Sequence, residues 1–267
     1  MINQFPDFII IGAMKSGTTS LHYYLRNNSN LFLPLVKELN YFIEEWNYKK
    51  GIDWYTSHFH KIDIPKGEAS PDYTKAHIFE GVPERMYKLL PEIKLIYLYR
   101  DPVERAYSHY LHLYATGFEK RSIKEAMVPG SDYILTSKYY WQIRKFLEFY
   151  KREQLLFIDS SRLRNDRKKV MKEICDFIGV KNDFKEKVLN KELHLSKDKT
   201  KRSKLNKLIF NSSVGIYLKK RTPESMKKIY RNISENKMGV PVLDEHLKKE
   251  LYSILEEDYA KFEELLV

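Results

Sequence analysis

The sequence predicts an α/β protein built on a doubly wound parallel sheet, with helices on both faces and a helical C-terminal part. Short apolar runs at 8–11, 94–99 and 155–158 have the length and composition of buried strands. A segment with helical spacing of apolar residues follows each run, and strands that alternate with helices usually pair in parallel. After residue 206 the pattern is helical only.

The first apolar run leads into a helix through a glycine-rich loop. Gly12 and Gly17 lack a Cβ, so the backbone can bend tightly and approach an anion closely. The unpaired N–H groups at the start of the next helix would face that anion, and Lys15 adds a full positive charge. This P-loop-like pattern predicts a phosphate or sulfate site comprising Lys15, Ser16, Gly17, Thr18, Thr19 and Ser20.

The other elements have recognisable ends. Pro71 disfavours a helix at Ser70. Asp101 can cap a helix that has Pro102 at its first position. In chain order we expect a helix at 18–26, an extended segment at 31–33, a short helix at 52–59, a strand end and turn at 67–73, a helix at 84–90, a strand at 94–99, a helix from 102, a helical stretch at 133–150, a strand at 155–158, a helix closing at Gly179 and a last helix at 243–266.

Length and composition favour one domain. With 267 residues, of which 43% are hydrophobic, the chain can bury a sizeable core. We expect a single domain over 1–267, divided into an α/β core at 1–180, a basic loop at 181–205 and a helical segment at 206–267. The net charge of +11 suits an anionic cofactor, an acidic substrate, nucleic acid or a membrane surface, and does not choose among them.

The only cysteine, Cys175, excludes an intrachain disulfide, so a cytoplasmic location is the simplest expectation. No apolar stretch is long enough to cross a bilayer, and we expect no membrane partner. The sequence does not indicate an oligomeric state.

The basic stretch between 191 and 204 has two interpretations. It can be a solvated surface loop, or a lid over a nucleotide phosphate. Its charged residues are Lys191, Lys197, Lys199, Lys201, Arg202 and Lys204, against Glu192 and Asp198.

Three blocks resemble sulfotransferases that use 3′-phosphoadenosine 5′-phosphosulfate (PAPS), over about residues 7–180. The Lys15-Ser-Gly-Thr-Thr order resembles their 5′-phosphosulfate loop. Arg100 and Ser108, in Tyr-Arg-Asp-Pro-Val-Glu-Arg-Ala-Tyr-Ser, resemble the pair that holds the 3′-phosphate. The segment 155–163 resembles the strand and turn that follow. The similarity is strongest to the heparan sulfate or carbohydrate type and its soluble bacterial relatives.

The resemblance implies roles for further residues. In the carbohydrate type the catalytic base is a Glu that follows a Lys, and Lys37-Glu38 matches this pair. The resemblance also implies that Lys37 lies near the sulfonate and that Lys15 contacts the leaving phosphate. Taken alone, Lys37-Glu38 is a surface ion pair, and His22, His58, His60 and His77 are rival bases. Lys201 and Arg202 would belong to the cofactor loop.

The acceptor is less defined than the donor. Glu68 and Asp72 can line the acceptor site or only fix the turn at Pro71, and Tyr41 is a candidate for stacking. The family often has Lys where this chain has Ala69, so a charge on the acceptor side is missing. Aromatic residues suit a sugar and an aromatic natural product equally.

The implied function is transfer of a sulfuryl group from PAPS to a hydroxyl or amine of a sugar or small natural product, with 3′-phosphoadenosine 5′-phosphate (PAP) as product and no metal. One alternative, a P-loop kinase, needs Lys directly after the second glycine and a magnesium-binding residue, which the sequence lacks. The other, a non-catalytic polyanion- or nucleic-acid-binding protein, would use the charge but would not need Arg100, Ser108 or Glu38. We therefore expect no nucleic-acid partner.

Overall fold

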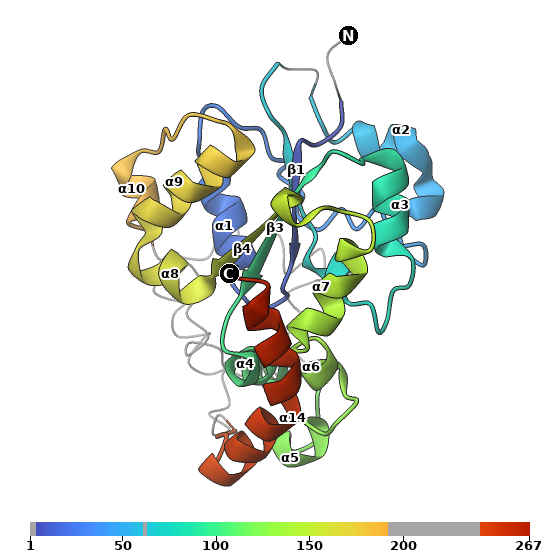
Figure 1. Cartoon of the computed structure of the whole chain (residues 1–267), viewed down its shortest axis with the longest axis vertical. Coiled ribbons are helices and arrows are strands. Elements are labelled where there is room, and N and C mark those ends of the chain that lie inside the picture. The colour runs from blue at the N-terminus through green and yellow to red at the C-terminus, as the bar shows by residue number, and fades with distance from the viewer. Residues whose placement is uncertain (1–3, 61–62, 192–240) are drawn as a thin grey trace, which may run out of the picture.

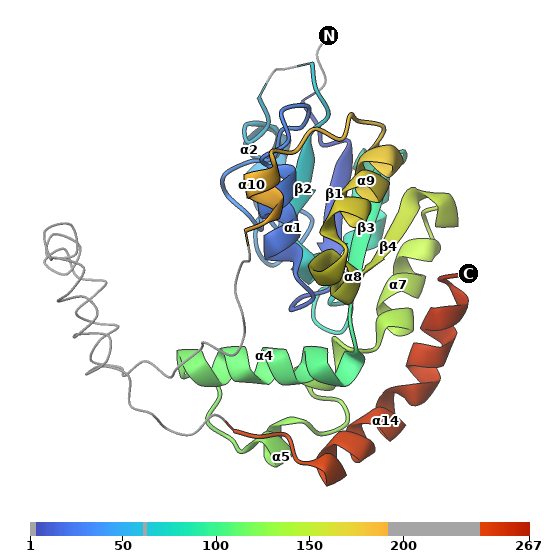
Figure 2. The ribbon, with the colours of Figure 1, turned by 90° about the vertical axis from the view of Figure 1, so that its left-hand side faces the viewer.

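Four parallel strands form the centre of the molecule in the computed structural model, which describes residues 4–60, 63–191 and 241–267. The strands are β1 (Phe8–Gly12), β2 (Gly67–Ala69), β3 (Lys94–Tyr99) and β4 (Leu155–Asp159). Their order in the sheet is β2-β1-β3-β4 (Figure 1, with β2 labelled in Figure 2). Ile10 lies opposite Ala69 on one side and Ile96 on the other. Because all four strands are parallel, their carboxyl ends share one edge of the sheet.

The two faces of the sheet carry separate cores. Phe8 and Ile10 pack toward one face, and Ile9 and Ile11 pack toward the other, because successive side chains of a strand alternate. The first face is covered by α1 (Thr18–Leu25), α8 (Ser160–Asn165), α9 (Arg167–Ile178) and α10 (Glu186–Leu189). The second is covered by α2 (Gly51–Thr56), α3 (Val82–Leu89), α7 (Tyr139–Leu147) and the end of α14 (Glu245–Glu264). The doubly wound α/β prediction is confirmed.

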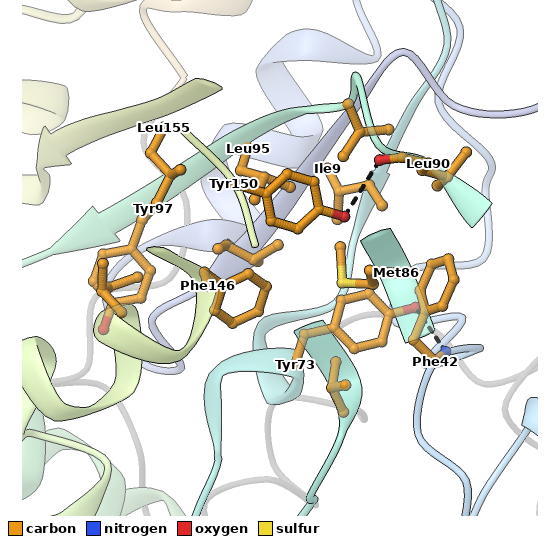
Figure 3. Close-up of a cluster of buried hydrophobic side chains, with 14 of the residues drawn as sticks. Ile9, Phe42, Tyr73, Met86, Leu90, Leu95, Tyr97, Phe146, Tyr150 and Leu155 are labelled. Atoms are coloured by element: carbon orange, nitrogen blue, oxygen red, sulfur yellow. Dashed lines mark hydrogen bonds between the residues drawn. The ribbon is translucent and has the colours of Figure 1, made fainter. Parts of the chain in front are cut away.

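The second face has an aromatic core (Figure 3). Tyr73, Tyr97, Phe146 and Tyr150 are each at most 2% exposed. The Tyr150 hydroxyl donates to the carbonyl oxygen of Leu90 at 3.3 Å, which satisfies its polar end inside the core.

A third layer lies beyond the carboxyl edge of the sheet. Figure 2 shows α4 (Pro102–Thr116) running across that edge, with α5 (Ile123–Ala126) and the first half of α14 on its far side. Together with α6 (Asp132–Leu135), these helices bury their own apolar cluster, which includes Val103, Tyr110 and Leu251. The edge where ligands bind in open α/β sheets is therefore bordered by α4.

The predicted elements agree with the structure except over 133–150. The helical stretch expected there is two helices, α6 and α7, separated at 136–138. Ser137 causes the break, since its hydroxyl accepts from Arg105 Nε at 2.6 Å and donates to the Pro102 carbonyl oxygen at 2.7 Å. These bonds hold Ser137 on α4, and Lys138 has a non-helical ψ of 82°.

Several short elements were not predicted: α5, α8, α10 and the 3₁₀ turns η1 (Tyr48–Lys50), η2 (Pro71–Thr74) and η3 (Arg152–Gln154). The segment at 31–33 contributes one bridge, Phe32 to Lys66, rather than a strand. Of the helical segments predicted after residue 206, α14 is described, and the others lie outside the described residues. The proposed division into core, basic loop and C-terminal segment stays a prediction.

The end of α14 is held by Phe262, whose ring lies 5.1 Å from Tyr99, 5.3 Å from Tyr139 and 5.5 Å from Phe157. Phe262 is fully buried. We expect Phe262→Ala to lower the free energy of unfolding by about 3–5 kcal/mol, because it empties a packed aromatic site.

The matched control is Phe118→Ala, since Phe118 is 78% exposed and should change stability by less than about 0.5 kcal/mol. Urea unfolding followed by circular dichroism measures both. Equal effects of the two substitutions would show that α14 does not depend on Phe262.

Candidate active site

The loop after β1 turns through two residues with left-handed backbone, Lys15 at φ 71° and Gly17 at φ 97°. Its start is tied to the sheet, because the Ala13 N–H donates to the Leu98 carbonyl oxygen at 2.7 Å. No side chain caps α1, and no acidic residue lies in its first turn. The positive end of the α1 dipole is thus available to an anion.

Gly12 is required by close packing rather than by its φ angle. A Cβ at Gly12 would stand 2.6 Å from Thr74 Oγ1 and 2.6 Å from a ring carbon of Tyr97. The end of β1 is therefore wedged between η2 and β3, which fixes where the loop begins.

The hydroxyls of the loop divide into two groups. Ser16 is 1% exposed and Thr18 is 4% exposed, so both side chains point into the protein. Ser16 lies beside the Tyr139 hydroxyl, which in turn donates to the Arg100 carbonyl oxygen at 3.0 Å. Thr19 is exposed and Ser20 is partly exposed, so these two side chains are the ones able to meet a ligand.

Arg100 follows β3 directly and lies at the same edge of the sheet as the loop. Its Nη2 lies 3.5 Å from Glu104 Oε2, one turn into α4. Ser108, a further turn along, is on the same side of the helix at four-residue spacing and is 6% exposed. Asp101 caps α4 by accepting from the Glu104 N–H at 2.8 Å, which fixes the helix relative to Arg100.

Glu38 also reaches this edge. Its N–H donates to the carbonyl oxygen of Ala69, the last residue of β2, at 2.9 Å. Its carboxylate is 44% exposed and forms an ion pair with Lys37. Glu38 has φ 64°, and Asn40 has φ 49° with its N–H bonded to Ser70 Oγ at 3.1 Å. Left-handed conformations of such residues are unfavourable and are concentrated at functional sites.

Four predicted features therefore converge on one edge of the sheet. These features come from three separate stretches of chain: the loop, Lys37-Glu38, and the segment with Arg100 and Ser108. Each is placed by the carboxyl end of a strand or by the helix that follows it. Such an arrangement can hold a doubly phosphorylated nucleotide and keep a carboxylate beside it. The individual roles of these residues stay predictions.

His22 is a poor rival to Glu38 as a base. Its ring is 7% exposed, and its Nε2 lies 3.2 Å from the Pro34 carbonyl oxygen, so this nitrogen carries the proton and donates. Burial lowers the pKa of His22 to about 4, and the nearby Lys37 and Arg26 charges act in the same direction. The influence of Lys37 and Glu38 on this pKa also places α1 close to that pair.

The three predicted acceptor residues are largely enclosed. Glu68 is 1% exposed and accepts hydroxyl hydrogen bonds from Tyr55, Ser70 and Tyr73 at 2.5, 2.6 and 2.7 Å. Burial raises the pKa of Glu68. Tyr41 is 5% exposed and stacks on Tyr55 with ring centroids 4.4 Å apart. These contacts are typical of structural residues, and the acceptor roles of both remain predictions.

Asp72 forms an ion pair with Lys75 at 3.2 Å. Lys201 and Arg202, predicted for the cofactor loop, lie outside the described residues. Among the residues with described positions, no group of histidine, cysteine and carboxylate side chains could hold a metal ion.

The sequence did not single out the polar side chains that α4 and α6 bring to the same region. Arg105 and His109 are at most 1% exposed, and Asp132 lies beside them. The one sequence feature that could have indicated this cluster is that Arg105 and His109, a charged group and an imidazole, fall on the buried side of a predicted helix.

Comparison with known proteins identifies the class. The sequence profile of the sulfotransferase domain matches residues 5–263, so the chain belongs to the sulfotransferase family, whose members transfer a sulfuryl group from PAPS to an acceptor. It is an enzyme of that family, as the Lys15 loop and Arg100 block predicted.

Among its relatives is the human bifunctional heparan sulfate N-deacetylase/N-sulfotransferase 1, which is 32% identical over 203 residues. This match takes in 67% of the chain and 23% of the relative. The mouse bifunctional heparan sulfate N-deacetylase/N-sulfotransferase 4 is 31% identical over 210 residues, with the same coverages. The chain thus spans about a quarter of the length of these curated relatives.

The crystal structure of a sulfotransferase from Alicyclobacillus acidocaldarius has the same fold. It superposes with a TM-score of 0.69 at 24% identity, over 98% of this chain and 95% of that one. None of the described helices is long and apolar enough to cross a membrane.

The buried imidazole of His22 makes the protein sensitive to acid. Because the pKa is lower in the folded state (about 4) than in the unfolded chain, the unfolded state binds a proton first as pH falls below 6.5. Stability should fall by about 2–3 kcal/mol from this group between pH 7 and pH 4.5. We expect His22→Gln, which can still donate to Pro34, to remove that part of the loss.

Urea unfolding at the two pH values measures the effect. The control is His246→Gln, because the His246 side chain is 81% exposed. If His22→Gln keeps the full pH dependence of the wild type, the neutral state assigned to His22 is incorrect.

Proposed function

We propose that the chain transfers the sulfuryl group of PAPS to a hydroxyl or amine of a sugar or small natural product, with Glu38 as general base. The observation that supports this most directly is the bond from the Glu38 N–H to the last residue of β2. It brings the carboxylate to the edge where the Lys15 loop and Arg100 also end.

The donor would bind across the carboxyl ends of β1 and β3. The 5′-phosphosulfate would lie on the N-terminus of α1, with the ammonium of Lys15 and the hydroxyls of Thr19 and Ser20 around it. The 3′-phosphate would meet Arg100 and Ser108. Glu104, now 3.5 Å from Arg100, would give way to the phosphate.

Transfer would proceed by in-line displacement. The acceptor oxygen or nitrogen forms a bond to sulfur while the bond from sulfur to the bridging oxygen breaks. The electron pair of the broken bond stays on the 5′-phosphate of PAP, where Lys15 and the loop N–H groups stabilise the negative charge. Glu38 takes the proton that the acceptor loses, and Lys37 neutralises the carboxylate until then.

The acceptor class follows from the relatives that are named heparan sulfate N-sulfotransferases. A saccharide amine or hydroxyl is therefore the acceptor we favour, with a small natural product as the broader class. We further propose that transfer needs no metal, since Lys15 supplies the positive charge, and that the reaction takes place in the cytoplasm.

The predicted 3′-phosphate site leads to a nucleotide preference. PAP should bind more tightly than ADP or AMP, because only PAP carries a phosphate for Arg100 and Ser108. We expect Arg100→Ala to weaken PAP binding by about 1.5–3 kcal/mol, the usual contribution of a hydrogen bond to a charged group.

Titration calorimetry with the three nucleotides tests this preference. The control Arg144→Ala removes an exposed arginine on α7 and should leave the dissociation constant unchanged. Equal affinity for PAP, ADP and AMP would argue against PAPS as donor.

The predicted base has a separate test. Glu38→Gln keeps the size of the side chain but cannot take a proton, so kcat should fall by about 10²–10⁴-fold while PAP affinity stays nearly constant. Transfer of ³⁵S from labelled PAPS to a panel of saccharides, amines and phenols measures kcat.

The matched control is Glu84→Gln, which breaks the exposed pair with Lys88 at 2.6 Å and should leave turnover intact. Normal turnover by Glu38→Gln would exclude Glu38 as the base. Loss of PAP binding together with activity would instead make Glu38 a structural residue.

A further inference from the structure

A cluster of polar side chains surrounds Asp132 at the start of α6. One carboxylate oxygen, Oδ1, accepts from His77 Nε2 at 2.7 Å and from Thr136 Oγ1 at 2.8 Å. The other, Oδ2, lies 3.6 Å from Lys75 Nζ and 3.8 Å from His109 Nε2. We call these five residues the Asp132 cluster.

The hydrogen bonds of His77 fix its role. Gln142 is oriented by two backbone contacts, since its Oε1 accepts from the Ala76 N–H at 2.8 Å and its Nε2 donates to the Leu135 carbonyl oxygen at 2.9 Å. The same Nε2 lies 3.1 Å from His77 Nδ1, which must therefore accept. His77 is then protonated on Nε2 and donates to Asp132. With both nitrogens used, His77 orients the carboxylate and is not itself a base.

The Oδ2 atom of Asp132 has unused hydrogen-bonding capacity. Lys75 Nζ and His109 Nε2 are both beyond hydrogen-bond distance of Oδ2, and of the two only the Lys75 ammonium offsets its charge. The Asp132 side chain is 36% exposed, whereas those of Lys75, His77 and His109 are 9%, 7% and 2% exposed. The carboxylate is thus the solvent-facing member of an otherwise enclosed cluster.

His109 provides an independent sign that the cluster is incomplete. Its Nδ1 is buried and has no hydrogen-bond partner among the residues with described positions. Burial lowers the pKa of His109 to about 2, with Arg105 and Lys75 as additional causes, so the ring is neutral. A buried polar atom without a partner is unusual in a folded protein and often marks a site that a ligand or water completes.

The cluster adjoins the donor site through three elements. Thr74, next to Lys75, touches the end of β1 at Gly12. His109 follows Ser108 on α4, and the charge of Lys15 acts on the pKa of His109. Gln142 lies one turn after Tyr139, whose hydroxyl bonds to the Arg100 carbonyl oxygen. The elements that hold the loop and the nucleotide residues therefore also hold Asp132.

We propose that Asp132 is an acceptor-binding residue whose Oδ2 accepts a hydrogen bond from an amino or hydroxyl group of the acceptor. Lys75, 3.6 Å away, can donate to a neighbouring oxygen of the same molecule. A hydrogen-bond donor (Lys75) beside a hydrogen-bond acceptor (Asp132 Oδ2) at this spacing matches adjacent ring substituents of a sugar. The site therefore favours a saccharide over a simple phenol. The inference rests on the proposed function and names the substrate class for that site.

Asp132→Asn tests the proposal. The substitution keeps an oxygen for His77 and Thr136 but replaces Oδ2 by an amide NH₂ group. This group repels the Lys75 ammonium and cannot accept a hydrogen bond from a hydroxyl or amine of the substrate. With labelled PAPS, we expect KM for saccharides such as cellobiose and glucosamine to rise about 10- to 100-fold, with kcat changed less. PAP affinity and the rate with p-nitrophenol should remain those of the wild type.

The control is Asp258→Asn, in which a structural carboxylate is neutralised. Within the described part of the chain, Asp258 accepts hydrogen bonds from the N–H groups of Tyr140 and Trp141, each at 3.0 Å. This variant should lose stability in urea but keep the wild-type KM. A structural role for Asp132 alone would give the same result for both variants, or a parallel loss of PAP binding.

Two further results separate this inference from the proposed function. If the wild type binds PAP and sulfates saccharides while Asp132→Asn has an unchanged KM, the inference fails and the proposed function stands. If the PAP-loaded wild type sulfates no saccharide, and none shows a saturation-transfer NMR signal with it, the saccharide assignment is overturned. If the wild type does not bind PAP at all, the proposed function itself fails.

Discussion

The close contact at Gly12 is the constraint on which the site depends. Because no side chain separates the end of β1 from Thr74 and Tyr97, the loop, η2 and β3 meet within van der Waals distance. The Lys15 loop then starts beside the turn that leads to Lys75 and beside the strand that ends at Arg100. The absence of a Cβ at Gly12 thus lets the segments that carry the proposed donor-binding and acceptor-binding groups meet closely.

Charge near the site is controlled by burial. His22 and His109 are kept neutral because their rings are enclosed and lie beside cations. Two imidazoles that could compete for the acceptor proton are thereby removed, which is consistent with the proposal that the exposed carboxylate of Glu38 takes it. The buried carboxylate of Glu68 accepts hydrogen bonds from three hydroxyl groups, so its contacts are those of a structural residue.

Residues that directly follow a strand could be predicted from the sequence, and residues placed by tertiary contacts could not. Lys15 and Arg100 come right after apolar runs, so a parallel sheet alone brings them to one edge. Asp132 meets His77 and His109 through contacts between segments that are distant in sequence, and no periodicity encodes these contacts. Likewise the break before α7 depends on Ser137 reaching α4, a contact distant in sequence.

The pairing of Arg100 with Glu104 affects the end of the catalytic cycle. One turn of α4 places the Glu104 carboxylate 3.5 Å from the guanidinium, so Glu104 is at hand to pair with Arg100 when no nucleotide does so. If Arg100 holds the 3′-phosphate as proposed, it can pass to Glu104 as PAP departs without leaving its charge unpaired. In the proposed mechanism an internal counterion of this kind would lower the barrier to product release, so the contact that competes with nucleotide binding would also speed the exchange of spent cofactor for fresh donor.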